Sequence, residues 1–461
     1  MKAPIRAVLL TAVLIQGCKP AVAARGRGSD AELLHAAVSK LSSVIVYDIF
    51  SPPQASRAYA YSSIAAYETL RQGHPSYQTL AGQLNGLAAV PAPDSGVTYD
   101  FSLAGVHAFM TVGRALTFSR GRMDSLRTAM DEEIRRTGVP RPVYDRSIAY
   151  GERVADHILA WSKQDHFLQT RGMPKYTVTS ERGRWVPTPP AYMDAVEPNW
   201  GRLRPFVMDS ASQFKPLPPF PFDTARSSSF FREAKEVYDV KQALTPEQRE
   251  ITAFWDCNPY VMHVQGHAMF ATKKITPGGH WMSIVTIAAR QSGADVMKAA
   301  EAYARTSIVL ADGFISSWDE KFRSNVIRPE TVINAFIDEQ WEPMLQTPPF
   351  PEYTSGHSVI STAAAVVLSQ EFGTSFHFRD TSEAAYGLPV RTFGSFEEAA
   401  AEAAISRLYG GIHYRRSIEQ GAVQGRRVGE LVVQRLRTRA GDAPQVVAAA
   451  GGVATPPALG R

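Results

Sequence analysis

The chain has 461 residues, of which 44% are hydrophobic and 20% are charged, and its formal net charge is +5. This length predicts two packed layers or two domains, because a single core stops growing at about 250–300 residues. The positive charges form no long Lys/Arg block, which argues against a nucleic-acid-binding or membrane-surface protein and suits an anionic small-molecule ligand.

Residues 1–18 have the pattern of an export signal. Lys2 and Arg6 precede a short apolar run over 7–15, which is too short to span a bilayer as a mature helix. The run ends in Leu-Ile-Gln-Gly-Cys, which resembles a lipoprotein cleavage box with Cys18 as the lipidated residue. Lipidation, ordinary secretion and a buried apolar helix stay open here. We expect an exported protein, either periplasmic, extracellular or lipid-anchored to the membrane, with no transmembrane span after the leader.

The sequence has two cysteines, Cys18 and Cys257. Removal or lipidation of Cys18 leaves Cys257 alone, so no internal disulfide is expected and stability must come from core burial. A free cysteine in an apolar run usually acts as a small hydrophobic side chain.

Residues 30–168 are predicted to form an N-terminal helical region. Apolar residues recur at spacings of three and four over 55–71, 103–118, 123–137 and 144–162.

Residues 169–222 differ in character, because they are rich in proline and contain Trp185 and Trp200. We interpret this segment as a long ordered connection over the surface rather than a disordered linker.

Residues 245–437 are predicted to form the catalytic domain. Thr245 followed by Pro246 is a helix-start signal. Further helices are predicted over 281–290, 294–318, 357–372, 396–409 and 417–436, and no segment shows the alternation of a sheet. The predicted fold class is therefore all-α, built from helical bundles. The tail over 440–461, mostly Ala, Gly, Pro and Val, is expected to fray.

A first chemical segment contains Lys321, Arg328 and Pro329. Lysine supplies a point charge and arginine a planar fork of donors, both suited to anionic oxygens. Pro329 disfavours helical backbone at Arg328, so that side chain should leave the chain at a fixed angle. Alone, such a pair is most often a solvated surface charge pair.

A second segment contains Ser355, Gly356 and His357, directly before an apolar helix. Free backbone N–H groups at a helix start form an anion site. His357 would stand beside that anion, where a group that titrates near neutrality exchanges protons. The alternative is a capping serine with an uninvolved histidine.

A third segment contains Ser406, Arg407, Gly410-Gly411 and His413. On one straight helix Arg407 and His413 would face apart, so they can share a ligand only if the chain bends between them. The glycine pair permits that bend. The alternative is a core histidine beside a surface arginine.

Taken together, the order and spacing of the three segments resemble the superfamily of type 2 phosphatidic acid phosphatases and vanadium-dependent haloperoxidases. The resemblance covers about residues 245–437, and the N-terminal half carries no motif of its own. It implies a haloperoxidase-like helical fold. The matching residues are Lys321, Arg328, Pro329, Ser355, Gly356, His357, Ser406, Arg407 and His413.

The resemblance also implies a role for each matching residue. His413 would bind the central atom, as the metal ligand to vanadium or as the nucleophile toward phosphorus. Lys321, Arg328 and Arg407 would neutralise the oxyanion oxygens, and preorganised charge of this kind is usually the largest catalytic term. Ser355 and the Gly356 amide would add hydrogen bonds, and His357 would be the acid–base group.

Two positions depart from the phosphatase pattern. Thr354 stands where that pattern usually has proline, and Ser417 stands where it has an aspartate that would hold the far ring nitrogen of the second histidine. The loss of this carboxylate should impair phosphoryl transfer more than vanadate ligation, which favours a haloperoxidase. Trp318 and Phe350 resemble the apolar halide pocket of fungal-type chloroperoxidases, although ordinary core packing explains them equally well.

Several other polar residues have weaker patterns. His263 and His267 are four apart, as metal ligands on a helix can be, but they lack an evident third ligand. His280 begins a predicted helix and could line the site entrance, and Asp256 could brace one of the arginines.

Three functions follow from these observations. The first is a vanadate-dependent haloperoxidase that oxidises halide with hydrogen peroxide, and phosphate is expected to compete for the same site. The second is a soluble acid phosphatase that cleaves a phosphate ester through a phosphohistidine at His413. The third is an exported, non-catalytic lipoprotein that binds oxyanions.

Overall fold

The computed structural model describes residues 27–136, 138–439 and 441. The predicted signal over 1–18 and all of the predicted tail except Gly441 lie outside the described residues. The long α-helices of the N-terminal part are α1 (Arg27–Asp48), α2 (Pro52–Leu70), α3 (Phe101–Leu116), α4 (Arg120–Arg136) and α5 (Arg141–Ser162), followed by the short α6 (Phe167–Arg171). The helices that follow are α7 (Ser229–Gln242), α8 (Pro246–Phe254), α9 (Pro277–Gln291), α10 (Val296–Ser324), α11 (Pro329–Phe336), α12 (Gly356–Phe372), α13 (Phe396–Tyr409) and α14 (Arg415–Arg435).

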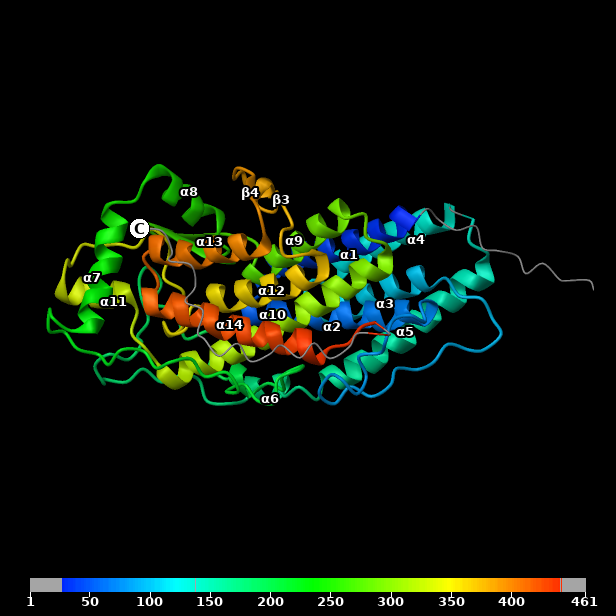
Figure 1. The fold of residues 1–461 in the computed structure, drawn as a ribbon, viewed down its shortest axis with the longest axis horizontal. Helices are drawn as coiled ribbons and strands as arrows, with labels where there is room; N and C mark the ends of the chain where they lie inside the picture. The colour runs from blue at the N-terminus through cyan, green and yellow to red at the C-terminus, as the bar shows by residue number, and fades with distance from the viewer. Residues whose placement is uncertain (1–26, 137, 440, 442–461) are drawn as a thin grey trace, which may run out of the picture.

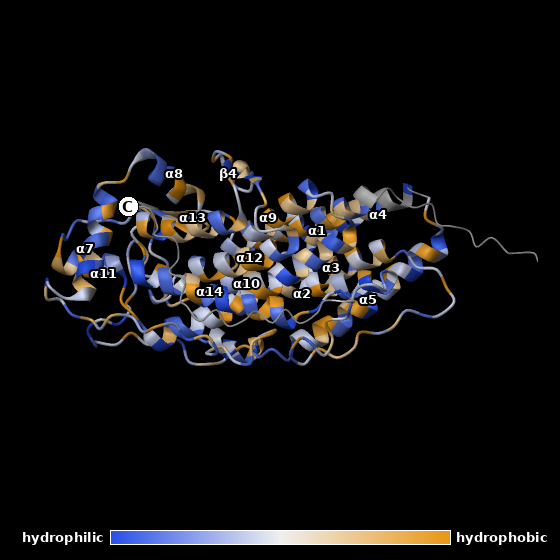
Figure 2. Cartoon of the chain, in the orientation of Figure 1, coloured by the Kyte–Doolittle hydropathy of each residue, from blue (hydrophilic) through white to orange (hydrophobic). Residues whose placement is uncertain are grey.

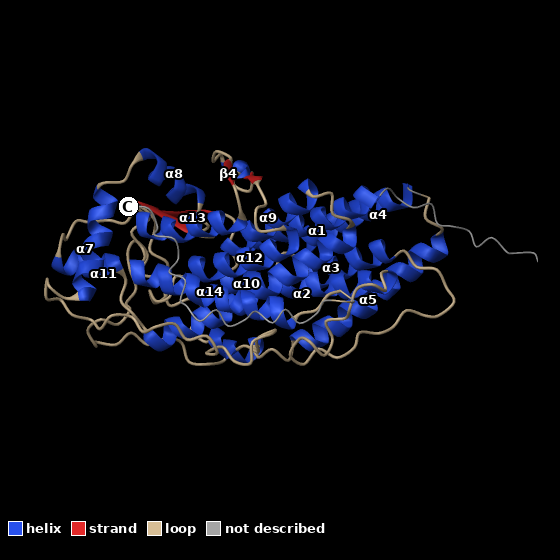
Figure 3. Ribbon diagram, in the orientation of Figure 1, coloured by secondary structure: helices blue, strands red, loops and turns tan. Residues whose placement is uncertain are grey.

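The short elements are two antiparallel hairpins and three 3₁₀ turns. They are β1 (Val261–Gln265) with β2 (Ala268–Thr272), β3 (Phe378–Asp380) with β4 (Arg391–Phe393), η1 (Arg71–Gly73), η2 (Trp200–Arg202) and η3 (Ala384–Tyr386). The prediction of an all-α protein is confirmed, as the helical ribbon in Figure 3 shows. The expectation that no segment pairs as a sheet is wrong for the hairpins. The second strand of the first hairpin is almost wholly exposed, so no buried face imposes an alternating pattern on it.

Helix α10 connects the two ends of an elongated molecule (Figure 1). It packs against α2 of the N-terminal set and against α12 and α14 of the C-terminal set. One hydrophobic core runs through both sets, and Figure 2 shows hydrophobic residues gathered along the central helices. The N-terminal helices therefore support the C-terminal ones directly.

Local capping signals explain where α10 begins and ends. The Asp295 side chain accepts a hydrogen bond from the Lys298 backbone N–H at 2.8 Å, which satisfies a free donor of the first turn. Asn325 ends the helix in the left-handed conformation, with φ of 49°. The last turn of α10 thus delivers Lys321 to a fixed place.

Helices α12 and α14 approach each other closely where Gly425 faces Val359. A Cβ atom at Gly425 would lie 2.0 Å from the Val359 carbonyl oxygen, so only glycine fits there. The contact continues to the N-terminus of α12, where the Ser355 backbone N–H donates to the Ser417 carbonyl at 3.2 Å. This packing brings the starts of the two helices together.

Residues 169–222 run mostly without regular structure but pack on the helical body. Trp185 and Trp200 are fully buried. Asp312 of α10 accepts hydrogen bonds from the backbone N–H groups of Phe206, Val207 and Met208 at 2.6, 2.8 and 3.0 Å. Among the described residues, no helix is both long and apolar enough to cross a membrane.

Candidate active site

The structure places the Lys321 segment as its sequence predicts. The chain leaves α10, and Arg328 then caps α11 in extended backbone with φ of −77° and ψ of 152°, directly before Pro329. Both cationic side chains are fully buried. The prediction that Arg328 leaves the chain outside helical backbone is confirmed.

The second segment forms the N-terminus of α12. Ser355 is its N-cap, and the Ser355 hydroxyl accepts hydrogen bonds from the backbone N–H and the hydroxyl of Ser358, at 3.3 and 2.9 Å. Gly356 is the first helical residue. Its backbone N–H belongs to the first turn, whose donors lack partners within the helix and suit an anion.

The third segment bends as expected. Helix α13 ends at Tyr409, and Gly411 has a left-handed φ of 78°. A Cβ atom at Gly411 would also lie 3.0 Å from the Trp341 ring, so both conformation and space favour glycine. The reversal lets Arg407 and His413 approach the same cavity from different elements.

The second and third segments converge on one cavity of about 420 Å³. Its walls include Gly356, His357, Arg407 and His413. The first segment adjoins this wall, since Arg328 Nη1 lies 3.3 Å from Nε2 of His413. The structure therefore brings together the residues that the sequence separates.

Backbone carbonyls orient the two buried cations. Lys321 Nζ donates to the carbonyls of Pro351, Glu352 and Thr354. Arg328 donates to the carbonyls of Pro348, Phe350 and Ile412. Burial, and then the neighbouring Arg328, lower the pKa of Lys321 well below its ordinary value, while burial lowers the pKa of Arg328 to about 10. An anion in the cavity would favour the charged form of both side chains.

Glu352 is a functional residue that the sequence analysis missed. Its Oε1 lies 2.6 Å from Nδ1 of His413, and it also accepts from the Tyr414 backbone N–H at 3.1 Å. The conclusion that the far ring nitrogen of His413 has no carboxylate partner is therefore wrong. The carboxylate comes from the loop before α12, whereas Ser417 lies 3.4 Å from the same nitrogen. The available signal was an acidic residue three positions before Ser355, in the segment that holds Ser355, Gly356 and His357.

The pairing with Glu352 fixes the chemistry of His413. A proton on Nδ1, donated to the carboxylate, leaves a lone pair on Nε2. Burial, and then Arg328, lower the pKa of His413 well below its ordinary value, so the ring stays neutral. In the structure this lone pair accepts from Arg328 Nη1 at 3.3 Å, and a neutral imidazole with an unprotonated Nε2 is the form that binds a metal.

His357 lies at the cavity wall with Nε2 unpaired among the described residues. Burial, and then Arg407, lower its pKa well below the ordinary value. Arg407 is itself buried, and its Nη2 donates to the Trp255 carbonyl at 2.6 Å. Burial lowers the pKa of Arg407 as well.

These donors fit a tetrahedral oxyanion such as vanadate. Three basic side chains, those of Lys321, Arg328 and Arg407, are buried here. The carboxylates of Glu352, Glu320, Glu330 and Asp256 offset their charge in part. Buried charge without a counter-charge is costly, so the cavity favours an anion. The unpaired Nε2 of His357 needs a polar partner in the same place.

Two aromatic residues form the apolar wall beside the cations. The rings of Trp318 and Phe350 lie 4.9 Å apart at 52°, and Lys321 Nζ lies 5.1 Å from the centre of the Phe350 ring. The wall continues into the N-terminal part of the chain, where Phe50 and Pro52 line the same cavity. No motif in the sequence indicates this second contribution.

Two weaker expectations are wrong. Asp256 pairs with Lys274 at 2.7 Å rather than with an arginine, although its charge acts on Arg407. His280 is fully buried in the first turn of α9, between Asp380 and Glu383, so it does not line the entrance.

The other two histidines belong to the first hairpin. His263 is in β1, where its ring stacks on Phe270, and His267 lies at the turn between the strands. The four-residue spacing is therefore not a helical face.

A helical bundle around a cationic pocket with two buried histidines fits the superfamily that the sequence resembles, and the comparison with known proteins identifies the branch. Residues 301–441 match the family described as the VCPO second helical-bundle domain. The crystal structure of the first bacterial vanadium-dependent iodoperoxidase is similar, with 51% sequence identity, a TM-score of 0.85 and coverage of 90% of this chain and 98% of that chain. No curated protein sequence matches the chain.

Two bacterial vanadium-dependent chloroperoxidase structures share the fold at 16% identity. The match to the holo form has a TM-score of 0.61 and covers 84% of this chain and 92% of that chain. The match to the apo form has the same TM-score and covers 82% of this chain and 92% of that chain. The chain belongs to the vanadium-dependent haloperoxidases. It is an enzyme of that type, with vanadate as cofactor and with small molecules such as halide and peroxide as substrates. The phosphatase and the non-catalytic binding protein are not favoured.

Proposed function

We propose that this enzyme is an iodoperoxidase. In the reaction hydrogen peroxide takes two electrons from iodide, and with one proton the products are hypoiodous acid and water. The observation that carries the proposal is the 51% identity to a bacterial iodoperoxidase over 98% of that protein, against 16% to the chloroperoxidases.

The residues of the cavity have separate roles in this proposal. His413 Nε2 is the protein ligand of vanadium, and the three cations hold the oxygens together with the Gly356 amide. Ser355 adds a hydrogen bond from its hydroxyl. When bound, vanadate supplies a Lewis-acidic centre that makes peroxide oxygen electrophilic toward halide.

His357 moves the proton that the reaction consumes. Its low pKa keeps the ring neutral near neutral pH. With the ring proton on the other nitrogen, which has the backbone hydrogen bond to Trp255, the unpaired Nε2 can accept a proton from peroxide and return it later. Replacement His357→Ala should retain vanadate and lower turnover by about 10²–10⁴-fold, as is typical of a general acid–base group. The matched control His263→Ala changes a histidine of β1 and should leave vanadate content and turnover unchanged. Full turnover of the His357 variant would remove this role.

The halide preference of the enzyme is tested with vanadate-loaded protein. Initial rates with iodide, bromide and chloride are measured at equal peroxide concentration, with vanadate-free protein as the blank. We expect iodide oxidation that depends on vanadate and no comparable rate with chloride. Chloride oxidation as fast as iodide oxidation would contradict the assignment.

Trp318 and Phe350 form the halide side of the pocket in this proposal, because they place apolar surface beside Lys321. Phe350→Ala should change the ratio of iodide to bromide rates more than it changes vanadate affinity. An equal effect on both halides together with weaker vanadate binding would indicate a packing role alone.

Export is proposed from residues 1–18 alone. Fractionation of expressing cells, with a Cys18→Ala variant to separate a lipid anchor from free secretion, tests it. Protein found only in the cytoplasm would contradict export.

A further inference from the structure

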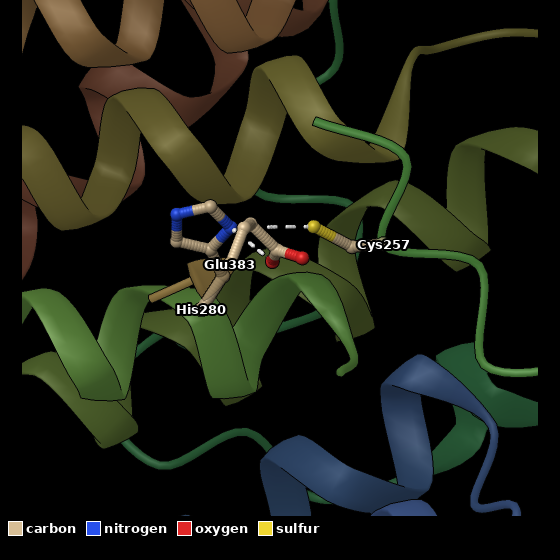
Figure 4. Close-up of side chains that lie close together, drawn as sticks. All are labelled: Cys257, His280 and Glu383. Carbon is tan, nitrogen blue, oxygen red and sulfur yellow. Dashed lines mark hydrogen bonds and ion pairs between the residues drawn. The ribbon is translucent and has the colours of Figure 1, made fainter. Parts of the chain in front are cut away.

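A second cluster of metal-binding side chains lies beside the vanadate cavity. Cys257 Sγ lies 3.5 Å from Nδ1 of His280, and Glu383 Oε1 lies 3.1 Å from the same nitrogen. All three ligand atoms lie within 4.8 Å of one another, and all three residues are buried. Figure 4 shows the thiol and the carboxylate directed at one edge of the imidazole ring.

The far side of the His280 ring is held by a second carboxylate. Its Nε2 lies 2.8 Å from Asp380 Oδ2, and both side chains are fully buried. A carboxylate on one ring nitrogen fixes a proton there and turns the other nitrogen toward a metal, which is the usual arrangement around metal-bound histidine. Nδ1 is therefore presented to Cys257 and Glu383.

The buried carboxylate of Glu383 is the feature that most favours a bound cation. Its side chain is fully buried, and neither carboxylate oxygen accepts a hydrogen bond from the described residues. A buried carboxylate without donors is costly. The contact with His280 at 3.1 Å lacks hydrogen-bond geometry, so it leaves both oxygens free to bind a metal.

The two ligand-atom separations that involve His280 Nδ1 match a tetrahedral ion. Sulfur at about 2.3 Å and nitrogen at about 2.0 Å from zinc stand about 3.5 Å apart, and nitrogen and oxygen ligands stand about 3.3 Å apart. The observed separations are 3.5 and 3.1 Å. A thiolate, an imidazole and a carboxylate form a donor set typical of zinc.

We propose that Cys257, His280 and Glu383 bind one divalent zinc ion, with a water molecule as fourth ligand. Binding replaces the thiol proton and the proton on Nδ1 of His280, so each ion displaces two protons. No electron is transferred.

The zinc site lies against the vanadate pocket through residues 255–257. The Trp255 ring stacks on His280 with centroids 4.5 Å apart at 14°, and the Trp255 carbonyl holds Arg407. Cys257 also lines the cavity in which the enzyme handles peroxide. A zinc-bound sulfur is shielded on its ligand side, so we expect zinc to slow oxidation of this thiol.

The test uses purified, vanadate-loaded protein, in which the pocket histidines are already engaged. Metal analysis should find about one zinc per chain beside vanadium. Zinc added to protein that has been treated with chelator and then reloaded with vanadate should rebind with release of about two protons. Variants Cys257→Ser and Glu383→Gln should lose the zinc, whereas the matched control Glu397→Gln, in an exposed ion pair with Arg426, should retain it.

Two further measurements apply to the wild-type chain and do not require a variant to fold. Cobalt added to chelator-treated protein should give thiolate-to-cobalt charge-transfer absorption, because Cys257 is the thiol at the site. Peroxide should oxidise Cys257 faster in zinc-free than in zinc-loaded protein, as measured by mass spectrometry. Failure of wild-type protein to bind zinc or cobalt would overturn the proposal, as would zinc retained at full occupancy in both site variants.

Discussion

The carboxylate of Glu352 holds the ring of His413 through Nδ1, with 2.6 Å between the two atoms. Both side chains are buried, and Glu352 comes from the loop before α12 while His413 comes from the turn before α14. The histidine proposed to bind vanadium thus has its protonated nitrogen fixed by a residue distant in the sequence.

Replacement Glu352→Gln should weaken vanadate binding by about 10–100-fold, as the loss of partners behind metal ligands typically does. The amide oxygen can still accept from Nδ1, but the negative charge that strengthens Nε2 as a ligand is lost. Vanadate titration of the vanadate-free variant, followed by iodide oxidation, measures the change. The exposed Glu342→Gln is the control, and equal affinity in the two variants would contradict the role of Glu352.

Replacement His413→Ala should abolish vanadate binding while the fold remains, because its Nε2 is the proposed ligand of the metal. Vanadium analysis after gel filtration, together with circular dichroism, separates the two effects. A folded variant that retains stoichiometric vanadium and full turnover would exclude His413 as the ligand.

Ser417→Asp should not convert the enzyme toward phosphatase activity, contrary to what the sequence alone suggests. Its hydroxyl already lies 3.4 Å from Nδ1 of His413, and an aspartate there would add a second buried carboxylate beside Glu352. Like charges in a buried site disfavour ionisation of one another. We expect a lower free energy of unfolding and no rise in the ratio of aryl-phosphate hydrolysis to iodide oxidation.

The double variant Glu352→Gln, Ser417→Asp tests whether an aspartate at position 417 can replace the charge of Glu352. Here the aspartate replaces the lost charge, so vanadate affinity should recover part of the loss seen with Glu352→Gln alone. Ser417→Asn in the same background is the control without charge. No difference between the aspartate and asparagine variants would show that position 417 cannot serve the ring.

Phosphate should compete with vanadate, because Lys321, Arg328 and Arg407 respond to the charge and shape of an oxyanion rather than to its central atom. Reconstitution of vanadate-free protein at increasing phosphate concentration should need proportionally more vanadate for half-maximal activity. A half-maximal concentration indifferent to millimolar-range phosphate would mean that the two anions do not share the site.

Stability of the vanadate-free protein should depend on pH through Glu352. Burial raises the pKa of this carboxyl from 4.5 to about 7. Between these values the folded protein holds a proton that the unfolded chain has released, so this contribution to the free energy of unfolding is present below pH 4.5 and is lost as pH approaches 7. Urea titrations of wild type and Glu352→Gln should show the wild-type advantage shrinking over that window. Parallel curves would contradict the raised pKa.

The helices and the oxyanion residues could be predicted because their signals are local. Apolar spacing marks each long helix, and the glycine pair before His413 permits the bend that the shared site requires. Glu352 could not be predicted because its partner His413 lies far along the sequence, and the phosphatase pattern has its carboxylate at the position of Ser417 instead. The Cys257, His280 and Glu383 cluster also joins three separate segments, so no single motif indicates it. The place of Phe50 and Pro52 in the cavity wall could not be predicted either, because they lie far along the sequence from the oxyanion residues.

The placement of Phe50 and Pro52 at the cavity makes the first helices part of the entrance and not only a support. Residues 301–441, which match the family, contain the motifs but not this part of the wall. The access route can therefore differ between relatives whose oxyanion residues are identical. Variation at the start of α2 offers a way to alter which organic molecules reach the oxidant while the vanadate site stays unchanged.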